Sequence, residues 1–266
     1  MENVTCPYIL QGENIVKDFV VSRKAIIGTP KRTFRALDDV FFAIAAGETV
    51  GVVGESGSGK STLGEILGGL LKPTQGKVLY KGQDISLMTK EEYREYRKSV
   101  QFIFQDPKGS MNPYFRIKDV VAEPLITLDI IKDEEEIKAR VIQMIKKVGL
   151  EEDAIDKYPG EISGGQSQRV AIARALIVNP KVIVCDEAVS ALDVSVQAQI
   201  LNLLIDLQKQ FNTAYVFISH EIGVVNYMSD RIIVMNRGHI VETGTAEEVL
   251  MNPKEEYTKK LIESSF

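Results

Sequence analysis

Short runs of apolar, often β-branched residues recur along the chain and predict buried strands. These runs are Thr49–Val53, Lys181–Cys185, Ala214–Ser219 and Arg231–Met235. Stretches with helical spacing lie between them, notably Val194–Lys209, which follows Asp193. Buried strands that alternate with helices indicate a parallel sheet, so we expect an α/β fold.

The middle third of the chain, Asp106–Glu161, has a different, helical pattern. Its apolar positions recur at helical spacing: Ile137, Val141, Ile145 and Val148. The acidic run Asp133–Glu136 precedes them and resembles a capping box, and Gly149 follows them as a C-terminal cap. We expect a helical insert on the α/β core, in which the acidic run is the solvated start of a helix rather than a metal site.

The composition is that of an ordinary globular protein and disfavours nucleic acid as a partner. The 266 residues are 44% hydrophobic and 26% charged, and 32 Lys and Arg against 37 Asp and Glu give a net charge of −5. A weakly acidic chain lacks the positive field that non-specific nucleic-acid binding usually needs. The basic segment Arg23–Arg35 is expected to be a solvated loop, with contact to anionic lipid head groups or nucleotide phosphates as the alternative.

Nothing in the sequence predicts export or membrane insertion. The first residues lack a basic-then-apolar signal peptide, and no run approaches the roughly 20 apolar residues that span a bilayer. We therefore expect a cytosolic protein that serves a membrane only by docking to other chains. Cys185 lies in an apolar run and is expected to be a buried, reduced thiol, while Cys6 is too distant in sequence to predict a disulfide framework.

The run from Gly54 to Ser61 matches the pattern G-x-x-x-x-G-K-[ST]. It follows a predicted strand and precedes a helical stretch near Thr62, which is the context that this motif requires. The alternative is a flexible Gly/Ser loop, which would not need a strand before it and a helix after it. Glycines let backbone N–H groups point inward, and the helix N-terminus adds positive potential. Lys60 is predicted to contact the β- and γ-phosphates, and Ser61 to bind Mg²⁺. The candidate phosphate-binding residues are Gly54, Glu55, Ser56, Gly57, Ser58, Gly59, Lys60, Ser61 and Thr62.

A second acidic element follows the apolar run Val182–Cys185. Asp186 is predicted to hold Mg²⁺ through water, and Glu187 to polarise the water that attacks the γ-phosphate. Carboxylates at the end of a strand are often only turn formers, which is the alternative. The phosphate-binding loop earlier in the chain favours the functional interpretation.

Further motifs follow in an order that resembles one family over essentially the whole chain. They are the signature-like Ile162–Gln166, Gln105 within Phe102–Pro107 as the Q-loop, Ser190–Asp193 as the D-loop, His220 as the switch histidine, and Phe19 as the aromatic that stacks on adenine. Together with the phosphate-binding loop, they resemble the ATP-hydrolysing subunits of ABC-type membrane transporters.

The resemblance implies a P-loop NTPase (RecA-like) core with a helical ABC subdomain and a small antiparallel β region. The implied segments are 1–105 and 163–245 for the nucleotide-binding core, 106–162 for the helical signature subdomain and 246–266 for a C-terminal tail. It also implies catalytic roles for Glu187, His220 and Gln105, and Mg²⁺ binding by Ser61, Gln105 and Asp186. Besides Phe19 and the loop, ATP would be bound by Ser163, Gly164, Gly165 and Gln166.

Family partners follow from the same resemblance. Two such ATPase subunits, identical or different, sandwich two ATP molecules head to tail, and the helical insert docks on transmembrane permease subunits at the cytoplasmic face of the membrane. An extracytoplasmic solute-binding protein takes part indirectly. No nucleic-acid partner is implied.

Departures from the family pattern are few. Ile162 replaces Leu, Glu221 follows His220 where Asp is commoner, and Ser167 replaces a residue that is often basic, for which we expect a weakened surface contact. No catalytic group is lost, so we expect an active ATPase.

The extended Q-loop Phe104–Pro113 and the later segment Asn252–Thr258 resemble those of the peptide and nickel importers. Because the substrate does not touch this subunit, peptide and nickel both stay open. A soluble ABC-type ATPase acting on DNA, ribosomes or cofactor assembly is the alternative function. A P-loop kinase or GTPase is disfavoured, since the sequence has no [NT]-K-x-D element and the signature-like motif would be unexplained.

Overall fold

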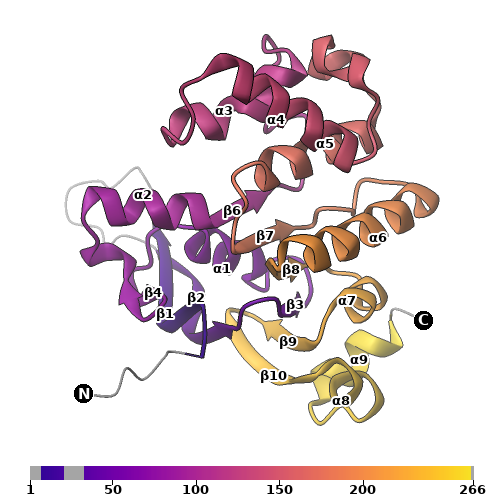
Figure 1. Ribbon diagram of the computed structural model, residues 1–266. Helices are drawn as coiled ribbons and strands as arrows, with labels where there is room; N and C mark the ends of the chain where they lie inside the picture. Colours follow the sequence, from indigo (N-terminus) through magenta and orange to yellow (C-terminus); the bar gives the residue numbers. More distant parts are fainter. Residues whose placement is uncertain (1–6, 21–32, 265–266) are drawn as a thin grey trace, which may run out of the picture. The chain divides into compact units, whose positions relative to one another are not determined.

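The computed structural model describes residues 7–20 and 33–264. The chain forms two compact units, one from Met1–Met88 together with Val216–Phe266 and the other from Thr89–Tyr215 (Figure 1). Cys6 and all but the last three residues of the basic segment Arg23–Arg35 lie outside the described residues, so their predictions stay untested.

In the first unit, a four-stranded antiparallel sheet has the order β2-β1-β4-β5. The strands are β1 (Leu10–Val20), β2 (Thr33–Ile44), β4 (Gln75–Tyr80) and β5 (Gln83–Asp84), followed by the short 3₁₀ helix η1 (Ile85–Leu87). Strands β1 and β2 pair from Leu10 opposite Ile44 to Val20 opposite Thr33, with register shifts between. This sheet is the small antiparallel β region that the family resemblance implied.

The same unit also holds β3 (Thr49–Val53), β9 (Arg231–Asn236) and β10 (His239–Thr245), with the helices α1 (Lys60–Leu67), α7 (Ile222–Met228), α8 (Ala246–Met251) and α9 (Glu256–Glu263). Strand β3 pairs in parallel with β9, and β9 pairs antiparallel with β10. Every residue of β3 is buried, as expected for a strand that is covered on both faces.

Gly51 lets helix α7 approach strand β3 closely. A Cβ atom at this position would collide with the side chains of Val225 and Ser229. Any larger residue would push α7 away from the strand that leads into the glycine-rich loop.

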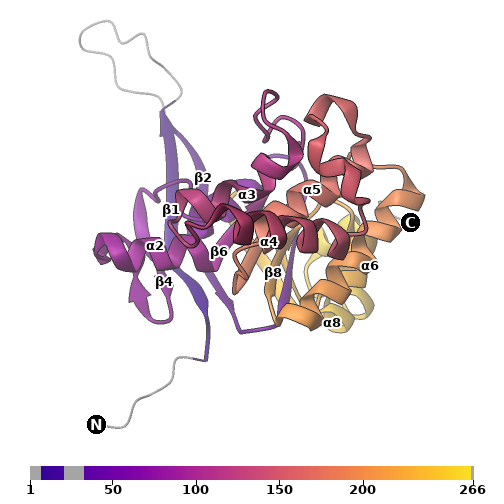
Figure 2. The same ribbon diagram turned by 45° about the horizontal axis from the view of Figure 1, so that its top comes forward.

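The second unit contains a parallel pair, β6 (Val100–Ile103) and β7 (Val182–Asp186), in which Val100 lies opposite Val182 and Ile103 opposite Cys185. Its helices are α2 (Lys90–Ser99), α3 (Ile117–Thr127), α4 (Glu134–Lys147), η2 (Glu152–Asp156), η3 (Pro159–Glu161), α5 (Gly164–Leu176) and α6 (Val194–Phe211). Figure 2 shows α3, α4 and α5 side by side, and the segment 106–161 forms only helices and turns. Strand β8 (Ala214–Ile218) follows at the end of this unit and runs into the first.

The predicted strands and helices are confirmed, with boundaries shifted by one or two residues. Asp193 caps α6 by accepting a hydrogen bond from the Val196 N–H at 3.0 Å. Asp133 caps α4 through the Glu136 N–H at 2.8 Å, while the carboxylate of Glu136 lies 3.2 Å from Arg140. Gly149 ends that helix with a φ of 74°, a conformation that favours glycine.

Two predictions about single residues have opposite outcomes. Cys185 is a free, buried thiol, as expected. The expectation of a surface contact at Ser167 is wrong, because this side chain is fully buried and its hydroxyl donates to the Ser163 carbonyl at 2.9 Å. Serine fits there because it bonds to the preceding helical turn, which a long basic side chain could not do inside the core.

Across residues 7–20 and 33–264, no helix is both long enough and apolar enough to cross a membrane.

Candidate functional site

The glycine-rich loop connects β3 to α1 in the first unit. Gly54, Gly57 and Gly59 have φ values of 151°, 79° and 106°, which side-chain-bearing residues rarely adopt. A Cβ on Gly59 would lie 2.7 Å from the Ala36 carbonyl oxygen, and one on Gly54 would collide with the Met235 carbonyl. These two glycines are therefore required both by their backbone conformation and by the close approach of neighbouring strands.

Lys60, the first residue of α1, is only 4% exposed. Its Nζ donates to the carbonyl oxygens of Gly54 at 2.7 Å and of Glu55 at 2.9 Å. The ammonium group thus lies within the loop and holds its first two carbonyls. A buried cation beside a helix N-terminus is the environment that favours an anionic ligand.

Ser58 gives a second sign that the loop is built for a ligand. Its side chain is buried, and its hydroxyl has no hydrogen-bond partner within residues 7–20 and 33–264. The N-cap of α1 is Gly59, so no side chain caps the first N–H groups of this helix. A phosphate chain would satisfy such donors, so the residues fit a nucleotide. Ser61 is exposed and Thr62 half-buried in the first turn.

The predicted adenine platform, Phe19, lies near the end of β1 with its side chain 37% exposed. Its partner across the strand pair is Phe34, and Lys17 Nζ lies 5.2 Å from the centroid of the Phe19 ring. An aromatic ring with a partly exposed face can stack on a base. In the same unit, the exposed His220 lies between β8 and α7, where the Glu221 N–H donates to Ser219 Oγ at 3.0 Å.

In the second unit, Gln105 and Glu187 meet because β6 and β7 run in parallel and end at the same edge. Gln105 Nε2 donates to Glu187 Oε2 at 2.8 Å. Glu187 has a φ of 47°, an uncommon backbone conformation that turns the chain away from the end of β7. A cavity of about 550 Å³ lies here, lined by Phe104, Gln105, Asp106, Gly109, Ser110 and Asp186.

The signature-like motif forms the N-terminus of α5. Ser163 is its N-cap, with Ser163 Oγ accepting from the Gln166 N–H at 3.3 Å and Gln166 Oε1 accepting from the Ser163 N–H at 3.0 Å. Gly164 is exposed, and a Cβ on Gly165 would lie 2.8 Å from Val196 Cγ1. The motif thus presents an exposed serine and glycine at the start of a 13-residue helix.

Two basic residues that sequence reasoning missed tie the extended Q-loop to this helix. Lys108 Nζ donates to the Ile162 carbonyl at 2.7 Å, directly before Ser163. Arg174 donates to Ser110, reaching its carbonyl at 2.7 Å and its hydroxyl at 2.8 Å. One signal was available for Arg174, since it interrupts the apolar run Val170–Leu176.

The site residues therefore fall into two groups. The first unit carries Phe19, the glycine-rich loop and His220, while the second carries Gln105, Asp186, Glu187 and the signature-like motif. Within the second unit the structure brings Gln105 to Glu187. The convergence of the two groups on one nucleotide stays a prediction.

Comparisons with known proteins agree on one family. The profile described as ABC transporter matches residues 37–190. The chain is 50% identical over 233 residues to the oligopeptide transport ATP-binding protein OppF of Salmonella typhimurium, covering 88% of this chain and 70% of that protein. It is 48% identical over 232 residues to the dipeptide transport ATP-binding protein DppF of Lactococcus lactis subsp. cremoris, covering 86% and 74%. Among solved structures, it resembles the dimeric ATP-binding cassette MJ0796 bound to ADP and Pi, with a TM-score of 0.77 and 31% identity over 89% of this chain and 98% of that one.

Proposed function

Because this chain belongs to the ABC transporter family, we propose that it hydrolyses ATP to power a membrane importer of oligopeptides or dipeptides. The observation that carries this proposal is the buried Lys60 ammonium, held inside a glycine-rich loop at the start of α1. Peptide is favoured over nickel because the relatives named above are peptide transport proteins.

The first unit binds the nucleotide. Phe19 stacks on adenine, the loop from Gly54 to Thr62 surrounds the phosphates, and Lys60 neutralises the β- and γ-phosphates. The strands that flank the loop position its backbone, since Ala36 and Met235 pack directly against its glycines.

The second unit supplies the group that activates water. Glu187 polarises the attacking water, and the hydrogen bond from Gln105 fixes the orientation of its carboxylate. His220, from the first unit, contacts the γ-phosphate. The exposed Ser163 and Gly164 at the start of α5, with Gly165 and Gln166, close over the γ-phosphate that a second ATPase subunit holds, which makes the working unit a dimer of identical or related chains.

Magnesium is the expected metal, held by Ser61, Asp186 and Gln105. The donor set is made of oxygen atoms, which Mg²⁺ prefers, and Gln105 uses its amide nitrogen for Glu187, so its side-chain oxygen faces elsewhere. When bound, the ion supplies positive charge that offsets the charge on the phosphates.

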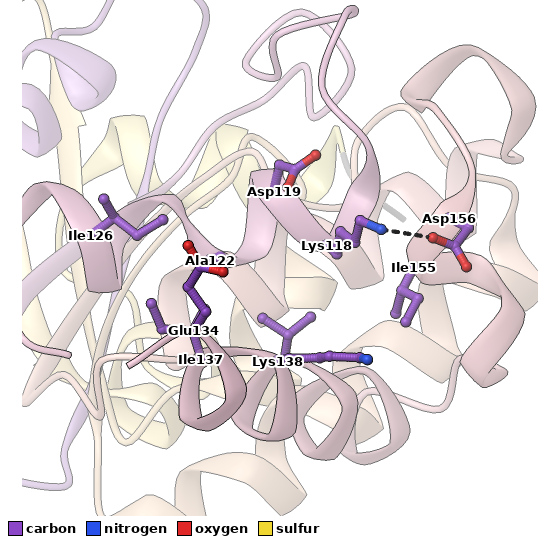
Figure 3. Close-up of a pocket in the computed structure, with 10 residues that line it drawn as sticks. Lys118, Asp119, Ala122, Ile126, Glu134, Ile137, Lys138, Ile155 and Asp156 are labelled. Atoms are coloured by element: carbon purple, nitrogen blue, oxygen red, sulfur yellow. Dashed lines mark hydrogen bonds and ion pairs between the residues drawn. The ribbon is translucent and has the colours of Figure 1, made fainter. Parts of the chain in front are cut away.

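The permease subunits dock on the helical part of the second unit. A groove of about 480 Å³ between α3 and α4 (Figure 3) has an apolar floor that includes Ala122 and Ile137. Val141 also lines this groove. Its rim carries charges of both signs, with Lys118 and Asp156 joined at 2.9 Å. An amphipathic helix with polar groups of both signs on its edges would match this groove, and we propose that a cytoplasmic loop of a permease supplies it.

The test is ATP hydrolysis by the purified chain and by Glu187→Gln. The amide keeps the shape of the side chain and still accepts from Gln105, but it cannot act as a base. We expect turnover to fall at least about a hundredfold while ATP binding is kept. Wild-type protein that neither binds nor hydrolyses ATP would refute the function, whereas equal turnover by the variant would refute only the role of Glu187.

A further inference from the structure

We propose that Tyr257, in the C-terminal helix α9, is a positioning residue for the phosphate-binding loop. The inference rests on the function proposed above, because it adds a residue to the same nucleotide site. The residue lies 202 positions from the loop in sequence, and both belong to the first unit.

The contact is a single hydrogen bond to the main chain of the loop. The Glu55 N–H donates to the phenolic oxygen of Tyr257 at 3.0 Å. This N–H belongs to the peptide group whose carbonyl oxygen is that of Gly54, which accepts from Lys60 Nζ at 2.7 Å. A peptide group is planar, and its oxygen and hydrogen point in opposite directions. The two hydrogen bonds therefore fix the orientation of the Gly54–Glu55 peptide plane from both sides.

This arrangement links Tyr257 to the lysine of the site. If the Gly54–Glu55 peptide group rotates, its oxygen leaves the Lys60 ammonium and its N–H changes direction. Glu55 accepts from the same ammonium through its own carbonyl at 2.9 Å, so both carbonyls that orient Lys60 depend on the conformation at this point. Tyr257 therefore sets the position of the charge that contacts phosphate without touching the nucleotide itself.

Helix α9 is itself fixed, so the tyrosine is more than a loose surface contact. The carboxylate of Glu242, in β10, accepts from the N–H groups of Lys254 at 2.8 Å and Glu255 at 3.2 Å, directly before the helix. Thr258 and Leu261 are buried on the inner side of α9. A continuous set of contacts thus runs from β10 through α9 to the phosphate-binding loop.

The experiment compares ATP hydrolysis by wild type, Tyr257→Phe and the control Tyr8→Phe, a partly exposed tyrosine of the same unit. Loss of one hydrogen bond that orders a binding loop predicts a KM for ATP about threefold to tenfold higher. We expect kcat within about twofold of wild type, since Tyr257 touches no reacting group. Tyr8→Phe should match wild type in both constants.

Two further readouts separate positioning from general stability. Thermal melting of Tyr257→Phe without nucleotide should stay close to wild type, while the rise in melting temperature that ADP causes should be smaller, because that rise measures affinity.

The inference is overturned if Tyr257→Phe keeps the wild-type KM, or if Tyr8→Phe reproduces its higher KM. Either result leaves the proposed function intact as long as the wild type hydrolyses ATP and Glu187→Gln does not.

Discussion

Gln105 and Glu187, 82 residues apart in the sequence, are joined by a hydrogen bond of 2.8 Å between an amide nitrogen and a carboxylate oxygen. The bond connects the second residue after β6 to the first residue after β7, so the Q-loop controls the direction in which the carboxylate points. Whatever displaces the Q-loop also displaces the proposed base.

Gln105→Ala should slow hydrolysis without abolishing it. A hydrogen bond to a charged group contributes about 1.5–3 kcal/mol, so we expect kcat to fall roughly tenfold to hundredfold. Steady-state ATPase assays at saturating ATP measure this, with Gln143→Ala, an exposed glutamine of α4, as the matched control. Unchanged kcat in Gln105→Ala would show that the carboxylate is oriented without it.

Lys108→Ala should affect the signature motif rather than the stability of the fold. Its ammonium holds the Ile162 carbonyl, so its loss frees the residue before Ser163, and we expect hydrolysis to fall several-fold with little change in melting temperature. Lys132→Ala removes an exposed lysine that pairs with Asp129, and it should leave hydrolysis unchanged. If both variants behave alike, the Lys108 bond has no part in the reaction.

Arg174→Met should destabilise the protein. Burial lowers the pKa of this guanidinium, an indication of a desolvated charge, and its two bonds to Ser110 would be lost. We expect the free energy of unfolding to drop by about 1–3 kcal/mol, measured by urea denaturation. Arg237→Met, at an exposed turn, is the control, and it should lower the free energy of unfolding far less. An equal loss of unfolding free energy in the two variants would show that the bonds from Arg174 to Ser110 do not stabilise the fold.

Substitution in the groove between α3 and α4 should separate docking from catalysis. Ile137→Asp places a charge on the apolar floor, so co-purification with the permease subunits should fall while hydrolysis by the isolated chain persists. Met251→Asp alters an exposed apolar residue of α8 and serves as the control. Normal assembly of Ile137→Asp would place the docking surface elsewhere.

The N-cap of α6, Asp193, should make the stability of the folded protein depend on pH. The N–H of Val196, and next the Ser195 hydroxyl, lower the pKa of Asp193 below its usual range. A depressed folded-state pKa contributes stability above the unfolded value of about 4, which is lost as pH falls through the folded value. The melting temperature of Asp193→Ala should therefore lie below that of wild type at pH 7, and the difference should shrink below about pH 4. A difference independent of pH would exclude the ionised cap as its source.

Patterns of local sequence predicted the helices and strands well, because these are encoded by neighbouring residues. The bounds of β3 were predicted as they are, and the glycines of the loop have the positive φ values that the motif requires. Side-chain contacts to distant parts of the chain were not predicted. Lys108, Arg174 and Tyr257 all bind backbone groups at least 54 residues away, and neither periodicity nor spacing carries that information.

Ser167 is a residue for which the sequence led to a wrong expectation. A family comparison of residue types led to the expectation of a surface position, whereas the helical register turns it inward, where it is fully buried. Register relative to the core is a tertiary property, and the five-residue motif Ile162–Gln166 does not determine which of the helical positions that follow it face inward.

Burial of Cys185 in β7 has a practical consequence for following the catalytic cycle. Desolvation raises the pKa of this thiol, so it stays protonated and unreactive toward maleimide reagents in the folded protein. With Cys6 replaced by serine, cysteines introduced at Leu87 and Val194, which are 79% and 82% exposed, would be the only sites that take up a dye. One position belongs to each unit, so energy transfer between the two labels would report their relative motion while ATP is turned over.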